Sequence, residues 1–213
     1  MRPDRHAVLF RGLADHAGAR RLPWPPAVRA ILWLDAVLLL AALLALGGMP
    51  PALSNVSSPW TWIALAGSTL TAGSAALSAF EATRSEYNPA WNWLPLPAFA
   101  LWMGASGLGC FALPDGALAW GGTFGEAGQC LKFLLAISAP LLALILFMLW
   151  WASPRMPGRA MALGGLASSG AAATLLALVH PHEAALLDLG AHALAVLTVL
   201  AVSASAARLP ARK

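Results

Sequence analysis

Two cysteines are the only thiols of this 213-residue chain, and each borders a long apolar run. A disulfide between Cys110 and Cys130 would close a loop of about 20 residues and stabilise the fold by about 3 kcal/mol in the chain-entropy treatment. Two alternatives stay open from the residues alone. The thiols could form a redox or soft-metal sensor, or they could be inert and buried.

A second group of possible ligands lies between the last two apolar runs. His180, His182 and Glu183 fall within four residues of one another. Together with Cys130 they would offer the nitrogen, oxygen and sulfur donors that bind zinc and softer metals. The plain alternative is that these side chains are solvated in a connector.

The ionisable residues inside predicted membrane spans include Asp35, Lys132, Asp188 and His192. A charge at the centre of a bilayer costs at least about 2.5–3.5 kcal/mol, so each should find a partner or water. Lys132, at the predicted start of its helix, and Asp188 lie at similar predicted depth and could pair. His192 follows Asp188 by one helical turn on the same face. The pattern predicts either a proton or ion path, or structural pairing and snorkelling.

The composition excludes a soluble globular domain. Apolar residues make up 59% of the chain and charged residues 10%, with a mean hydropathy of +0.70. A soluble domain carries about 25% charged residues. The high apolar share also excludes a disordered chain. We therefore predict an integral membrane protein in a lipid bilayer. No nucleic-acid-binding cluster, enzyme motif or cofactor motif is present in the sequence.

Six apolar runs are long enough to cross a membrane as helices of about 20 residues. They predict an all-α fold, a bundle of six transmembrane helices, with spans at roughly 27–48, 59–80, 92–113, 130–151, 157–180 and 184–207. The domain organisation that follows is an N-terminal segment (1–26), a transmembrane domain (27–207) and a short tail (208–213).

The distribution of positive charge predicts the orientation. Of the 13 Lys and Arg residues, all but Lys132 lie in or at the edge of the N-terminal segment, the second and fourth connectors, and the tail, with Arg29 at the entry of the first span. Positively charged connectors stay in the cytoplasm. We expect both termini to be cytoplasmic, with Cys110, Cys130 and the histidine pair on the outer face.

The fifth run carries small residues at every fourth position: Ala160, Gly164, Ser168 and Ala172. Such a stripe lets two helix backbones approach closely in lipid. We expect it to serve packing within the bundle, and a homodimer through the same stripe is the alternative.

The N-terminal segment has apolar residues at helical spacing, among them Leu9, Phe10 and Leu13, with Arg20 and Arg21 further along the chain. A short amphipathic helix of this kind can dock in the groove of a partner protein or lie on the membrane surface. The sequence therefore makes it a candidate partner-binding element.

The order and spacing of several short stretches resemble one bacterial family. These stretches are Arg20–Pro23, Arg29–Trp33, Trp93–Pro95, Cys130–Leu131 and the small-residue run Ala160–Gly170 followed by His180 and Glu183. Together they resemble the NrsF-like proteins, six-helix inner-membrane proteins of bacteria that act as anti-sigma factors. The resemblance covers most of the chain.

The resemblance implies a function and a location in the bacterial inner membrane. An extracytoplasmic-function sigma factor would be held at the cytoplasmic face, notably by the N-terminal segment, and an envelope signal such as redox or heavy-metal stress would release it. Cys130 matches one family cysteine. The other follows a histidine in the family, whereas this chain reads His180-Pro181-His182. Cys110 could take its place, or imidazole chemistry could replace it.

Two other functions compete with this interpretation. The intramembrane polar residues could serve a small proton- or ion-coupled transporter. The chain could instead be a structural subunit of a larger membrane complex. We expect a regulator rather than an enzyme.

Overall fold

The computed structural model describes residues 24–49, 51, 59–84, 86–111, 124–152, 157–179 and 186–206. Within these ranges the regular structure is entirely helical, as the sequence predicted. The elements are α2 (Pro26–Leu46), α3 (Pro59–Glu81), the 3-10 helix η2 (Pro89–Trp93), α4 (Leu96–Phe111), α5 (Phe124–Ala152), α6 (Pro157–Val179) and α7 (Leu186–Ala206).

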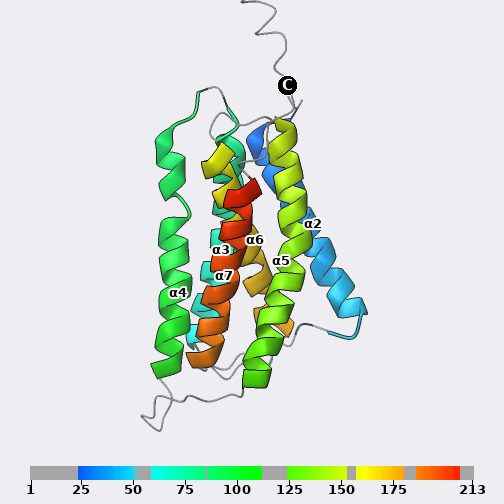
Figure 1. The fold of residues 1–213 in the computed structure, drawn as a ribbon, viewed down its shortest axis with the longest axis vertical. Coiled ribbons are helices and arrows are strands. Elements are labelled where there is room, and N and C mark those ends of the chain that lie inside the picture. Colours follow the sequence, from blue (N-terminus) through cyan, green and yellow to red (C-terminus); the bar gives the residue numbers. More distant parts are fainter. Residues whose placement is uncertain are drawn as a thin grey trace, which may run out of the picture.

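Successive α-helices run in alternating directions along one long axis (Figure 1). The end that holds the start of α2 also holds the end of α3, the start of α4 and the end of α7; we call it the terminal end. The opposite, distal end holds the end of α4, the start of α5 and the start of α7. The described chain therefore begins and finishes at the same end of the bundle.

Five of the described helices are long and apolar enough to cross a membrane: α2, α3, α5, α6 and α7. The third predicted span, 92–113, is the exception. It divides into η2, a turn and α4, and α4 has only 16 residues, where a crossing needs about 20. Pro95 and Pro97 explain why α4 begins late, because neither has the backbone N–H that a residue in the interior of a helix donates to the preceding turn.

The α5 helix begins earlier than the sequence predicted. Its first residue is Phe124 rather than residue 130. Cys130 and Lys132 therefore lie about two turns inside the helix and do not open it, which corrects the prediction for both. Pro140 lies in the interior of α5, where it removes one hydrogen bond of the helix.

The centre of the bundle is α6, which packs against α3, α5 and α7. Its stripe of small residues is buried within the chain, with Ala160, Ser168 and Ala172 fully inaccessible. The Cα of Gly164 faces Ile145 and Leu149 of α5. The stripe therefore serves packing within the bundle, which was the first of the two predicted uses.

Three glycines mark places where one helix approaches another closely. A Cβ at Gly67 of α3 would lie 2.7 Å from the backbone nitrogen of Trp102 in α4. A Cβ at Gly170 of α6 would lie 3.0 Å from the backbone nitrogen of Ala72 in α3. Gly165 of α6 instead makes room for the side chain of Ser203 in α7. Lipid supplies no hydrophobic drive between helices, so close approach of this kind supplies the attraction.

Hydroxyl groups inside the bundle are satisfied mainly by their own helices. Ser168 donates to the carbonyl of Gly164 at 3.0 Å, and Ser203 donates to the carbonyl of Val199 at 2.7 Å. Two contacts join α3 to α6: Thr174 Oγ1 of α6 lies 3.0 Å from Ser68 Oγ and 3.3 Å from Thr69 Oγ1 of α3. Small hydroxyl residues can thus be buried without leaving a donor unpaired.

The α2 helix is attached differently. Its buried residues are Arg29, Ala30 and Trp33, all near its start. Beyond them, Leu38, Leu39 and Leu46 are 67%, 62% and 86% exposed. Figure 1 shows the later part of α2 leaning away from the other helices. Full burial is therefore limited to the first third of this helix, while Val37, Leu40 and Leu44 further along are partly buried against the core.

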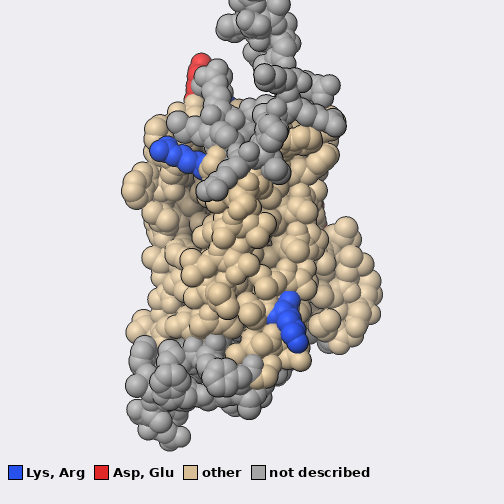
Figure 2. Space-filling model, viewed as in Figure 1, with Lys and Arg blue, Asp and Glu red and all other residues tan. Residues whose placement is uncertain are grey.

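The described surface is almost uncharged over the length of the helices. Figure 2 shows one face on which the few charged groups lie toward the two ends of the bundle. The exposed large side chains include Leu70, Phe147, Leu197 and Val202, each about half accessible. An apolar belt with charges at its borders is what a lipid environment requires.

Candidate functional site

The polar contacts of the described residues gather at the terminal end, where α2 begins. Pro25 and Pro26 start the helix, since proline is favoured in the first turn, and the backbone N–H of Arg29 donates to the carbonyl of Pro25 at 3.2 Å. Side chains on a helix point back toward its start. The Arg29 side chain therefore reaches toward the terminal end, where α3 finishes, and the residue is only 6% exposed.

Arg29 joins α2 to the last turn of α3. Its Nη2 donates to Thr83 Oγ1 at 2.9 Å, and its Cζ lies 5.3 Å from the centroid of the Phe80 ring. The Thr83 hydroxyl donates in turn to the carbonyl of Phe80 at 2.7 Å. Phe80 is fully buried. The guanidinium is thus placed by a hydrogen bond on one edge and by an aromatic face.

Two nitrogens of the same guanidinium have no acceptor. Nε and Nη1 of Arg29 are buried and lack a hydrogen-bond partner. The nearby carboxylate of Glu81 pairs instead with Arg84, at 3.4 Å. A buried donor without a partner costs about 1–3 kcal/mol, and more when the group is charged. The two unpaired donors therefore make an unfavourable contribution to the free energy of the contact between α2 and α3.

Trp33 makes the second attachment of α2, one turn after Arg29. Its side chain is fully buried, and its indole Nε1 donates to the backbone carbonyl of Leu141 in α5 at 3.1 Å. Leu141 directly follows Pro140, which lacks the backbone N–H for one of the hydrogen bonds of α5. Arg29 and Trp33 together attach α2 to two different helices.

The connector between α3 and η2 completes this end of the molecule. Tyr87 donates a hydrogen bond from Oη to Asn92 Oδ1, and Asn88 accepts one from the backbone N–H of Ala90 at 2.9 Å. Burial raises the pKa of Tyr87 above its usual value, while the positive charge of Arg159 lowers it to a smaller extent. The terminal end thus combines arginines, a tyrosine and carboxylates from three parts of the chain.

The residues predicted to carry chemistry are more widely spread. Cys130, in the second turn of α5, is buried in the core with 5% exposure. Lys132 and Asp35 lie exposed on α5 and α2. His192 is half-buried on α7. No three His, Cys, Asp or Glu side chains of the described part of the chain come together in a way that could hold a metal ion.

Several predicted site residues fall outside the described residues. They are Leu9, Phe10, Leu13, Arg20 and Arg21 of the N-terminal segment, and His180, His182 and Glu183 of the connector between α6 and α7. Cys110 lies in the last turn of α4 and Asp188 in the first turn of α7, and only their backbone is described. The proposed thiol pair, metal site and lysine–aspartate pair stay predictions.

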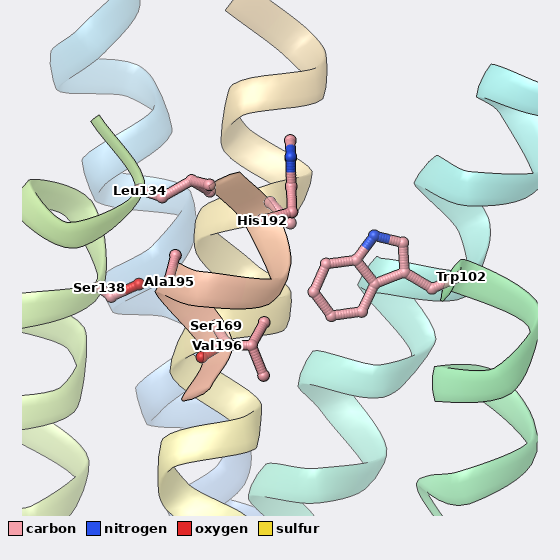
Figure 3. A pocket seen from close by; sticks show the side chains of 8 residues that line it. Trp102, Leu134, Ser138, Ser169, His192, Ala195 and Val196 are labelled. Carbon is pink, nitrogen blue, oxygen red and sulfur yellow. The ribbon is translucent and has the colours of Figure 1, made fainter. Parts of the chain in front are cut away.

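His192 borders a small recess inside the distal half of the bundle (Figure 3). Its polar lining comes from Ser138 of α5, Ser169 of α6 and His192 of α7, and Trp102 reaches toward it from α4. The remaining lining residues are Leu134, Ala173, Ala195 and Val196. The recess brings His192 to an interior position between four helices, but Lys132 and Asp35 are not part of it.

In the sequence, Arg29 stands out only as one positive charge at the start of a span, and Trp33 only as the end of the same short stretch. Their spacing of four residues carried a stronger signal, because i and i+4 share one helix face. An arginine within an apolar helix, one turn before a tryptophan, predicts a polar attachment to neighbouring helices. Thr83 and Phe80 carry no comparable signal, since only the tertiary structure brings them to α2.

The fold and this site define a small helical protein compatible with membrane insertion, with its polar contacts concentrated at one end. A family model described as "negative regulator of sigma F" matches residues 13–212. The chain therefore belongs to the NrsF family, as the resemblance indicated, and the family is one of negative regulators of a sigma factor. No curated protein and no solved structure matched the chain.

Proposed function

We propose that this protein is a membrane-bound anti-sigma factor that holds an extracytoplasmic-function sigma factor at the bacterial inner membrane and releases it on an envelope signal. The family match over residues 13–212 carries the proposal. Five apolar helices long enough to span a bilayer support the membrane location. The regulatory character of the family also speaks for a binding protein rather than an enzyme.

The sigma factor would bind at the cytoplasmic face through the N-terminal segment. The apolar positions Leu9, Phe10 and Leu13 would enter a groove of the partner, and Arg20 and Arg21 would lie near the membrane surface. The positive-inside distribution supports this side, because twelve of the thirteen cations, all except Lys132, lie in segments predicted to be cytoplasmic. Residues 1–23 lead directly into α2 and its attachment at the terminal end.

The signal would be received at the opposite face. Cys110 and Cys130 would undergo thiol chemistry there, and His180, His182 and Glu183 would supply further metal ligands. The burial of Cys130 has a consequence for this step. A buried thiol reacts only when its surroundings open, so sensing would be coupled to a rearrangement of the helices.

The test is recovery of a sigma factor with the membrane protein. The full chain is purified from membranes in mild detergent, and the co-purifying soluble proteins are identified. The triple variant Leu9→Ser, Phe10→Ser, Leu13→Ser should lose the sigma factor and raise transcription from its promoters. The same chain with residues 208–213 removed is the control, and it should keep the partner.

Equal recovery of a sigma factor with the triple variant and the wild-type chain would place the binding surface elsewhere. Recovery of no sigma factor with any form, combined with stable association with other membrane subunits, would favour a structural role. Signal sensing is tested separately, by labelling thiols in Cys110→Ser and Cys130→Ser variants under oxidising and reducing conditions. The two cysteines are unconnected if neither substitution alters labelling of the other.

A further inference from the structure

The contacts of α2 with the rest of the molecule are unusually local. Its buried residues are confined to Arg29, Ala30 and Trp33, whereas α6 is buried along most of its length. Beyond Trp33, Leu38, Leu39 and Leu46 are exposed, Leu40 and Leu44 are only partly buried against the core, and the helix diverges from its neighbours (Figure 1). The fully buried part of the attachment is therefore confined to one and a half turns of helix.

In a membrane, the exposed apolar side chains of α2 provide no force that holds it in place. Acyl chains are about as apolar as leucine, so separating two helices in lipid exposes nothing unfavourable. The docked position must come from specific contacts. On α2 the polar contacts are the hydrogen bond from Arg29 to Thr83, the Arg29–Phe80 contact, and the hydrogen bond from Trp33 to the carbonyl of Leu141. Partly buried side chains such as Leu40 and Leu44 add limited van der Waals packing against the core.

These contacts stabilise the docked position only weakly, because Arg29 also opposes it. Two of its nitrogens are buried without an acceptor. If α2 moved away from α3, the long side chain could extend to the membrane surface, where water and headgroups would satisfy every donor. The guanidinium is therefore better solvated in the released position than in the docked one. The same residue both attaches the helix and favours its release.

We propose that α2 is a latched helix, with a docked and a released position of similar free energy, and that Arg29 is the residue that sets the balance between them. Trp33 is the second contact of the latch. The bundle formed by α3, α4, α5, α6 and α7 is the fixed part against which α2 moves. Because α2 follows residues 1–23 directly, its position would also set how that segment holds the sigma factor; this last step rests on the proposed function.

The latch can be tested without any partner. The full chain is labelled with 5-fluorotryptophan and reconstituted in lipid nanodiscs, and its ¹⁹F NMR spectrum is recorded. The variants Trp33→Phe and Trp102→Phe assign the signals of the two tryptophans. Trp33 should give two signals, for docked and released α2, while Trp102 in the fixed bundle should give one.

The variants of Arg29 should shift the populations in opposite directions. Arg29→Ala removes both the hydrogen bond to Thr83 and the side chain that packs on Phe80, and it should raise the released population by about fivefold. The double variant Arg29→Met, Thr83→Val removes the hydrogen bond together with both unpaired donors and retains a side chain that packs on Phe80. It should raise the docked population, since apolar replacement of a buried polar pair is often stabilising. Leu39→Ala, which shortens an exposed side chain of the same helix, is the matched control and should change neither signal.

The inference is wrong if the Trp33 signal is single and identical in all these variants. It is also wrong if the double variant releases α2 as Arg29→Ala does, because the guanidinium would then be a net stabiliser. Transcription from the sigma-dependent promoters, measured in the same variants, tests the coupling independently. Shifted NMR populations with unchanged transcription would refute the coupling to the sigma factor, and the loss of all sigma binding in the wild type would refute the proposed function instead.

Discussion

The contact of α3 with α6 and the attachment of α2 hold helices together by opposite means. Between α3 and α6 the interface is made of Gly, Ala and Ser, and a single added methyl at Gly170 would touch the opposing backbone. At α2 the polar contacts and most of the buried surface come from Arg29 and Trp33, two of the largest side chains in the protein. The first interface is long and dry, whereas the second is short and polar.

The difference between the two interfaces shows how a small membrane protein can contain both fixed and movable parts. Close backbone packing brings many atoms into contact, and no rearrangement preserves those contacts. A hydrogen bond on a long side chain is a single contact that can be broken and replaced by water at the membrane surface. The two interfaces should therefore respond differently to substitution, to loss of hydrogen bonds and to pH.

The largest effect is expected from adding one methyl group where α3 and α4 touch. Gly67→Ala would place a Cβ 2.7 Å from the backbone nitrogen of Trp102, so the helices must separate. Overpacking of this kind costs about 1–3 kcal/mol. The free energy of unfolding, measured by titration with sodium dodecyl sulfate in mild detergent, should fall by this amount.

Gly73→Ala is the matched control for the same helix. A Cβ at Gly73 meets nothing within 4 Å, and alanine favours a helix by about 0.5–1 kcal/mol over glycine. This variant should be as stable as the wild type or more so. If both substitutions had the same effect, the contrast between close packing and open surface would not govern stability.

A smaller effect is expected from the hydroxyl pair between α3 and α6. Ser68 Oγ and Thr174 Oγ1 lie 3.0 Å apart, and each also lies within hydrogen-bond distance of a carbonyl of its own helix. Since each hydroxyl has one proton, one of them donates across the interface while the other donates within its own helix. Hydrogen bonds between membrane helices average about 0.6 kcal/mol in double-mutant cycles. The cycle of Ser68→Ala and Thr174→Val should give a coupling of this size in the same unfolding assay. A coupling of several kcal/mol would show that polar contacts dominate the fixed interface as well.

The smallest effect concerns pH at the terminal end. Burial raises the pKa of Tyr87, so the folded state keeps this proton to higher pH than the unfolded chain. The stabilisation is complete below the ordinary tyrosine pKa of about 10 and is lost as the pH rises through the raised value. Tyr87→Phe should therefore show a smaller loss of stability than wild type between pH 9 and pH 11. Identical pH profiles would mean that Tyr87 does not titrate differently on folding.

Much of the fold could be predicted because lipid imposes one dominant constraint. Uninterrupted apolar runs must become helices, since every backbone group has to be paired inside the segment. The predicted ends of α2, α3, α6 and α7 agree with the structure within about two residues. The errors fall where hydrophobicity carries no boundary signal. Pro95 and Pro97 shorten α4, and α5 extends back to Phe124 through residues too polar to be assigned to a membrane span.

The candidate site was much less predictable. Charges attracted attention because they are rare in the chain, yet Asp35 and Lys132 lie exposed on separate helices. Arg29 acquires its role from Thr83 and Phe80, more than fifty residues away. No spacing in the sequence relates these residues, because the contact depends on how α2 crosses α3.

By itself, the sequence determined that the chain is helical, that it is apolar enough for a membrane, and that it belongs to the NrsF family. These properties follow from local hydrophobicity and from the order of short motifs, and neither depends on which helices touch. Only the tertiary structure decided that the small-residue stripe of α6 is used inside the bundle, and that α2 is attached through a partly unsatisfied arginine. Side-chain pairing between distant segments has no local cause, so it can be known only once the helices are assembled.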